Sequence, residues 1–344
     1  MNLFEFFESA AAAFVGFMWG PPLLTILLGG GIYFSFYSRF VPFKYFRHGI
    51  KILFGSYHDP NDPGEITHFQ ALTSALASTV GLGNISGVAI AIQMGGPGAL
   101  FWMWVSAVVG MSTKFFSCTL AVLYRGTDDQ GNIQGGPMYY IENGLGSKYK
   151  PLSIMFSMAG LVGCTVMFQS NQLADIIRNQ VFIPNGWFDD DMMMGNLFQG
   201  LIMASLTALV IFGGIKRIGQ VASFMVPIMV VLYLFSGLLV IFNHLSEIPS
   251  LFKLIVYDAF TGDAVMGGAV GAVIIAGVRR ALFSNEAGLG TSDMAHGAAK
   301  TKEPIREGLV AMIEPFIDTI IVCTITAMVI LASGVWQDEG LNGV

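Results

Sequence analysis

Long apolar segments recur along this chain and constrain its fold more than any other feature. A helix needs about 20 apolar residues to cross the hydrocarbon core of a bilayer. Eight segments are predicted to cross, at residues 15–37, 70–94, 97–123, 151–178, 196–214, 220–242, 265–297 and 306–333. Hydrophobic residues make up 54% of the chain and charged residues 12%, whereas soluble domains carry about 25% charged residues. We therefore predict an all-α integral membrane protein, with the lipid bilayer as its surroundings.

Lysine and arginine are distributed unevenly between the two sets of loops. Four connecting segments hold most of these residues, namely Arg39, Lys44, Arg47, Lys51, Arg125, Lys148, Lys150, Lys216, Arg217, Lys300 and Lys302. The opposite set of loops holds Lys253 alone, with Arg178 at its edge. The positive-inside rule places the first set in the cytoplasm and both chain ends outside. The sequence has no basic cluster with interleaved aromatic residues, so we expect no nucleic-acid partner.

The second predicted crossing contains a glycine-rich interruption near its middle. Its residues are Thr79, Val80, Gly81, Leu82, Gly83 and Asn84. Glycine is a poor helix former, and unwound backbone within a membrane must line a cavity or be buried in protein. Freed amides would attract an anion, and freed carbonyls of the preceding half-helix would attract a cation. Discontinuous transporter helices have this layout, although close packing of two helices through small residues explains the pattern equally well.

The seventh predicted crossing changes character at Gly277, which we expect to be a second interruption. The residues before it are apolar, and those after it include Arg279, Arg280 and Glu286. Charges at membrane depth usually pair or line an aqueous path. Arg279 or Arg280 is therefore expected to pair with Glu286 two turns away, or with a residue of another helix.

The spacing of the two interruptions predicts an internal repeat. Five crossings, from the second to the sixth, precede the second interruption, and inverted repeats place broken helices in corresponding positions. We expect a peripheral helix and cytoplasmic loop in residues 1–64, a first five-helix repeat in 65–264 and a partial second repeat in 265–344. About three helices of the second repeat are expected to be missing.

Three ordered motifs resemble the alanine or glycine:cation symporter family, whose members are sodium:alanine symporters. They are GGPGALFWMWVSAVVG at 95–110, GGPMYYI at 135–141 and FSNEAGLG at 283–290. The resemblance implies a LeuT-like inverted-repeat transporter of which this chain has about 8 of 11 transmembrane helices. It implies a multi-pass protein of the bacterial cytoplasmic (inner) membrane that imports alanine or glycine with sodium. No cofactor is implied apart from the co-transported sodium ion.

The resemblance also implies a set of site residues. The substrate-binding residues would be Thr79, Gly81, Leu82, Gly83, Asn84, Gln169, Ile274 and Gly277. The sodium ligands would be the carbonyls of Ala77 and Val80, with Asn84 serving a second sodium ion if there is one. A helix of the missing part completes the first sodium site in this architecture.

The chain departs from the family pattern in the third crossing. The family usually has a glutamate after Lys-Phe-Ala, whereas Ser117 occupies that position here. Lys114 is therefore expected to lack its usual partner.

Proton coupling is a close alternative to sodium coupling. Glu314 and Asp318 lie within the eighth crossing, and carboxylates inside a membrane are candidate functional groups. Either could carry a proton, or both could simply be paired with Arg279 or Arg280.

Two other classes of function fit the sequence less well. A channel needs pore-lining rings or a continuous polar face, but the polar residues concentrate at the two interruptions. An enzyme needs a nucleophile–base pair or a set of metal ligands at depth. The candidates Glu286, Asp293 and His296 are sparse for a metal site. We expect a transporter without a metal site and without enzymatic activity.

Overall fold

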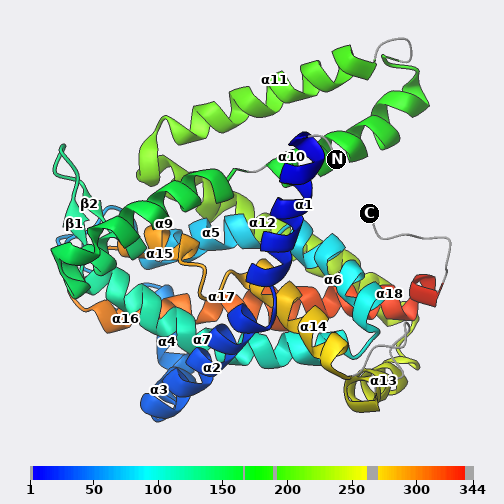
Figure 1. The fold of residues 1–344 in the computed structure, drawn as a ribbon, viewed down its shortest axis with the longest axis horizontal. Coiled ribbons are helices and arrows are strands. Elements are labelled where there is room, and N and C mark those ends of the chain that lie inside the picture. Colours follow the sequence, from blue (N-terminus) through cyan, green and yellow to red (C-terminus); the bar gives the residue numbers. More distant parts are fainter. Residues whose placement is uncertain (1–2, 166, 189–191, 262–269, 338–344) are drawn as a thin grey trace.

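The computed structural model describes residues 3–165, 167–188, 192–261 and 270–337, and most of them are helical (Figure 1). Within these residues, five helical segments are long and apolar enough to cross a membrane, and a bent pair makes up to six. The five segments are Glu5–Tyr37, Ala99–Leu123, Met192–Ile211, Gly214–Asn243 and Pro304–Ala332. This architecture agrees with the predicted all-α membrane protein. The division into two repeats stays a prediction.

The N-terminal third contains the first span, the bent pair and a long central helix. Its elements are α1 (Leu3–Met18), α2 (Pro21–Tyr37), α3 (Val41–Lys44), α4 (Phe46–Leu53), α5 (His68–Thr79), α6 (Leu82–Gly95) and α7 (Ala99–Leu123). Helix α7 packs against α2, α14 and α16, so it forms the centre of the fold. Thr67 caps α5 because its side chain accepts a hydrogen bond from the Gln70 backbone amide. The Gln70 side-chain oxygen in turn accepts a hydrogen bond from the Thr67 backbone amide.

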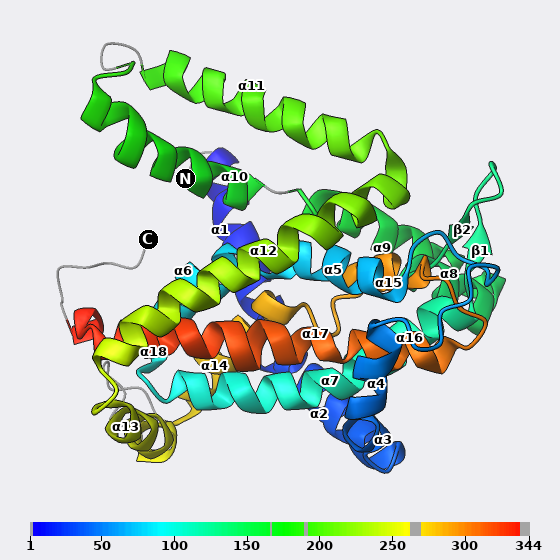
Figure 2. The ribbon, with the colours of Figure 1, turned by 180° about the vertical axis from the view of Figure 1, so that it is seen from behind.

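The middle third begins with a small hairpin and then forms an arm of helices. Its elements are β1 (Gly126–Thr127), β2 (Ile133–Gln134), α8 (Pro137–Tyr139), η1 (Tyr140–Gly144), η2 (Ser147–Tyr149), α9 (Lys150–Gly163), α10 (Met167–Ile177), η3 (Arg178–Phe182), η4 (Ile183–Asn185), α11 (Met192–Ile211) and α12 (Gly214–Asn243). Helices α10 and α11 extend away from the remaining helices in both views (Figures 1 and 2). Helix α12 packs on α5 and α18. The predicted crossing at 151–178 is divided between α9 and α10.

The C-terminal third supplies the second half of the packed core. Its elements are α13 (Ile248–Thr261), α14 (Val270–Asn285), α15 (Thr291–Gly297), α16 (Pro304–Ala311), α17 (Ile313–Pro315), η5 (Phe316–Cys323), α18 (Thr324–Ala332) and η6 (Val335–Gln337). Helix α13 was not predicted, because its residues were assigned to a loop. The Asp258 carboxylate of this helix accepts a hydrogen bond at 2.7 Å from the Gly98 amide, which caps the N-terminus of α7. The start of the predicted crossing at 265–297 lies outside the described residues.

The two ends of the molecule have different elements. In Figure 1, α15, α16 and the β1–β2 hairpin lie at one end and α13 at the other. At the first end, the Arg125 guanidinium donates hydrogen bonds to the carbonyls of Pro63, Ala299 and Thr301. The loops joined here also hold Lys302, so the positive-inside rule assigns this end to the cytoplasm.

Candidate functional site

The predicted interruption of the second crossing is present in the structure. Helix α5 ends at Thr79, α6 begins at Leu82, and their axes differ by 44°. Val80 and Gly81 between them have extended backbone, with φ of −79° and 176°. The pair α5–α6 is thus a broken helix, as the glycine pattern predicts.

The break leaves polar backbone groups without partners in either helical ladder. The Val80 amide donates to the Leu76 carbonyl, so the carbonyls after Leu76 extend past the last bond of α5. On the other side, Leu82 and Gly83 occupy the first turn of α6, where amides have no partner within the helix. Partial negative charge from α5 therefore meets partial positive charge from α6. An amino acid has both charges that such a pair of helix ends can bind.

Asn84 fixes the geometry of this break. Its side-chain oxygen accepts a hydrogen bond at 2.8 Å from the Gly81 amide. Its amide nitrogen lies 2.6 Å from Asp318 Oδ1, 3.0 Å from Ser284 Oγ and 3.1 Å from the Asp318 carbonyl. Asn84 is fully buried. The side chain therefore ties the first broken helix to two segments about 200 and 234 residues further along the chain.

Asp318 is the ionisable residue at the break, and the sequence did not predict its contacts. Its side chain is 0% exposed. Asn84, Ser284 and Thr319 donate hydrogen bonds to its carboxylate at 2.6–2.8 Å. In the described part of the chain, no basic side chain lies within ion-pair distance of Asp318. The proposed tie to Arg279 or Arg280 is wrong, since Arg279 Nε instead donates to the Trp19 carbonyl.

A second break exists, but not at Gly277. Helix α14 continues through Gly277 to Asn285, and the interruption comes at residues 286–290, where Glu286, Gly288 and Gly290 have positive φ. Gly277 is needed for packing, because a Cβ there would meet the Ala99 carbonyl of α7. The predicted position of this break is therefore wrong.

The end of α14 brings the second break to the first. Ser284 contacts both Asn84 and Asp318, and a Cβ on Gly83 would lie 3.5 Å from the Ser284 Cα atom. The side-chain Nδ2 of Asn285 donates a hydrogen bond to Thr319 Oγ1 at 3.0 Å, and its side-chain Oδ1 accepts one from the Ala287 backbone amide. The polar sequence before the second break is thus part of the same site.

The structure brings together some predicted site residues and separates others. Seven residues lie at or beside the first break, namely Ala77, Thr79, Val80, Gly81, Leu82, Gly83 and Asn84. Gln169 is exposed on α10, away from the break. Ile274 packs with Leu24 and Val278 in an apolar cluster that faces α2. On α14, Ser284 contacts Asn84 and lies close to Gly83 at the first break.

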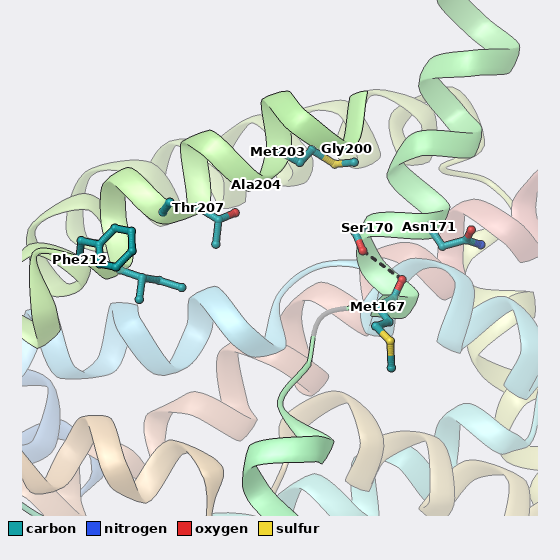
Figure 3. A pocket seen from close by; sticks show the side chains of 10 residues that line it. Met167, Ser170, Asn171, Gly200, Met203, Ala204, Thr207 and Phe212 are labelled. Atoms are coloured by element: carbon teal, nitrogen blue, oxygen red, sulfur yellow. Dashed lines mark hydrogen bonds between the residues drawn. The ribbon is translucent and has the colours of Figure 1, made fainter. Parts of the chain in front are cut away.

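A cavity of about 700 Å³ lies between α10 and α11 (Figure 3). Its lining residues are distant in sequence from both breaks. Its lining includes Ser170, Asn171 and Thr207 among apolar side chains, and the Ser170 hydroxyl donates to the Met167 carbonyl at 3.1 Å. No residue of either break lines this cavity. The breaks and this cavity are therefore separate features of the structure.

Lys114 has an acidic partner on another helix, although Ser117 replaces the glutamate that is its usual partner in the family. Its ammonium lies 2.8 Å from Glu314 Oε2 and also donates to Ser292. Glu314 is therefore held by α7 and not by Arg279 or Arg280. Glu286 is likewise not paired with those arginines, since it accepts a hydrogen bond from Thr291. Among the described residues, no group of three His, Cys, Asp or Glu side chains is arranged to hold a metal ion.

Comparison with known proteins gives one consistent family. The sequence pattern of the sodium:alanine symporter family matches residues 4–344. The sodium/alanine symporter AgcS of Methanococcus maripaludis is 41% identical over 95% of this chain and 71% of its own length. The uncharacterized transporter YflA of Bacillus subtilis is 42% identical over 94% of this chain and 68% of its own. The amino-acid carrier protein AlsT of Bacillus subtilis is 36% identical over 95% of this chain and 67% of its own.

Proposed function

Because the chain belongs to the sodium:alanine symporter family, we propose that it imports a small neutral amino acid, alanine or glycine, together with sodium. Its family and relatives are transporters and not enzymes. The name of the 41% identical relative, a sodium/alanine symporter, supports both the substrate and the ion. The bacterial inner membrane is the proposed location.

The substrate is proposed to bind at the α5–α6 break. The amides of Leu82 and Gly83, at the positive end of α6, would bind the substrate carboxylate, because a helix N-terminus is a favourable environment for an anion. Thr79, Gly81 and Asn84 frame the same break. Ser284 of α14 lies close to Gly83 and would form one wall of the same site. The roles of Gln169, Ile274 and Gly277 in binding stay predictions from the family resemblance.

The buried carboxylate of Asp318 is the observation that supports cation coupling. A charge inside a membrane protein needs a counter-charge, and the described residues place none beside Asp318. A sodium ion near Asn84 would supply it, and the carbonyls of Ala77 and Val80 would be further ligands of that ion. A proton on Asp318 would neutralise the same charge, so proton coupling is the second candidate.

The proposed architecture is a LeuT-like inverted repeat. Its support is the pair of broken helices, α5–α6 and α14–α15, which meet through Asn84 and Ser284. Broken helices in corresponding positions of two repeats form the midplane site of such transporters.

Uptake of labelled alanine into proteoliposomes tests this proposal. We expect saturable uptake that requires an inward sodium gradient at constant pH. Gly83→Val would place branches against the Ser284 backbone and reduce uptake by at least about tenfold, whereas Gly83→Ala makes only ordinary contact at 3.5 Å and serves as the matched control. Uptake that persists in potassium would refute sodium as the ion. Equal activity of the two variants would refute the location of the site.

A further inference from the structure

A second group of buried ionisable residues lies at the cytoplasmic end and is not used by the proposed site. We name it the cytoplasmic cluster, and its members are His68, Lys114, Asp293, His296, Glu307 and Glu314. Each is at most 2% exposed. They come from α5, α7, α15, α16 and α17, so the cluster joins segments of both broken helices to the core.

His296 lies between two carboxylates. Its Nδ1 atom is 2.5 Å from Glu307 Oε1, and its Nε2 atom is 3.8 Å from Glu314 Oε2. The other Glu307 oxygen contacts His68 Nδ1. In the described chain, His296 Nε2 and Glu314 Oε1 are buried and have no hydrogen-bond partner.

The position of His296 decides its protonation. A neutral imidazole that donates from Nδ1 to Glu307 has a lone pair on Nε2. That lone pair would face the Glu314 carboxylate in a region without solvent, which is unfavourable. A proton on Nε2 converts the same contact into an attraction between opposite charges.

Four of the six members, taken with His68 neutral, have charges that favour the same result. Lys114 and a protonated His296 balance Glu307 and Glu314, giving a neutral quartet that can be buried. Asp293 has neutral donors, because the Ser117 hydroxyl, the Cys118 thiol and the Tyr140 hydroxyl all donate to it.

Two further charged groups act on the quartet from outside. Arg125, in the loop before β1, attracts Glu307 over a longer distance. Glu286, at the second break, attracts Lys114. The first favours the negative charge of Glu307, and the second favours the positive charge of Lys114.

We propose that His296 is a proton-binding site. Its ring carries a second proton, on Nε2, while the cytoplasmic end is closed, and it releases that proton to the cytoplasm when that end opens. In the open state, water hydrates Glu307 and Glu314. These carboxylates then no longer need a positively charged His296 ring to compensate their charge. The His296 Nε2–H bond breaks, the proton passes to water, and the imidazole keeps its electron pair. A hydrated imidazole is mostly neutral above about pH 6.5, so release at cytoplasmic pH is favourable.

Nitrogen NMR of the protein labelled on histidine tests the protonation directly, without any need for transport. Three other histidines, His48, His58 and His244, are not buried and serve as internal references. We expect the His296 ring to stay doubly protonated at least one pH unit above the references, and Glu307→Gln to remove this difference. A His296 signal that is neutral at pH 7, or that titrates with the references, would overturn the proposal.

A transport measurement tests the release step, and this arm rests on the proposed function. At saturating external sodium and alanine, acidifying the compartment that faces the cytoplasmic end should slow uptake, approaching tenfold per pH unit for one released proton. His296→Gln should flatten this dependence, while His58→Gln should preserve it. Unchanged pH dependence in His296→Gln overturns the release step. Loss of uptake at every pH in the wild-type protein would instead refute the transport function and leave the NMR result valid.

Discussion

Removal of the Lys114 side-chain charge should destabilise the protein strongly. Lys114 is 1% exposed, and its ammonium lies 2.8 Å from Glu314 Oε2. Lys114→Met keeps the apolar stem of the side chain but leaves Glu314, among the described residues, with His296 at 3.8 Å as its nearest basic group. Breaking a buried ion pair from one side costs about 3–5 kcal/mol, because an uncompensated charge stays buried. For a chain of this size we expect the apparent Tm in detergent to fall by about 4–7 °C.

A double-variant cycle isolates the pair from other effects of the substitution. Glu314→Gln should cost a similar amount, since it leaves the ammonium unpaired, and the combined Lys114→Met/Glu314→Gln protein should be more stable than either single variant. Lys216→Met is the matched control, because the Lys216–Glu65 pair has a 62% exposed lysine and should change stability by at most about 1 kcal/mol. Thermal unfolding followed by size-exclusion chromatography gives all four values. Additive losses in the double variant would refute the buried pair.

Three further results follow from contacts elsewhere in the fold. Gly277→Leu should lower the apparent Tm because its Cβ meets the α7 backbone, while Gly271→Leu, with nothing within 4 Å, should not. Asp258→Ala should cost about 1–3 kcal/mol in thermal unfolding by removing the carboxylate that caps α7. The Lys302 ammonium holds the pKa of the Asp62 carboxyl below its ordinary 3.8, so the pair stabilises the protein above that pH and is lost as pH falls through the depressed value. An Asp62→Asn protein should therefore lose less stability than wild type between about pH 5 and pH 3.

The sequence identified the first break because the signal is local. Two glycines around Leu82 and an asparagine after them lie within a single crossing, and each prefers backbone outside a regular helix. The same reasoning failed at Gly277, where the glycine allows α7 to approach and α14 continues without interruption. A glycine in a membrane helix has either role, and only the neighbouring helix distinguishes them.

Contacts between segments that are distant in the chain could not be predicted from the sequence, for a different physical reason. The spacing of Arg279 and Glu286 on one helix suggested a pair, but neither arginine forms an ion pair with Glu286 in the described residues. Lys114 and Asn84 find their acidic partners 200 and 234 residues away. A helix can pack against any of several neighbouring helices, and the sequence pattern alone does not specify which of their faces are in contact. The signal that was available was the mid-crossing position of Asp318.

The proposed coupling role of Asp318 is tested most directly by the sodium dependence of alanine uptake in Asp318→Asn. The amide keeps the size of the side chain and removes its charge, so the half-saturating sodium concentration should rise about tenfold or more, equivalent to about 1.4 kcal/mol of lost ion binding. Asp62→Asn, at a carboxylate of the cytoplasmic loop, should leave sodium dependence unchanged. A half-saturating sodium concentration in Asp318→Asn equal to that of the wild-type protein would contradict the account of the site.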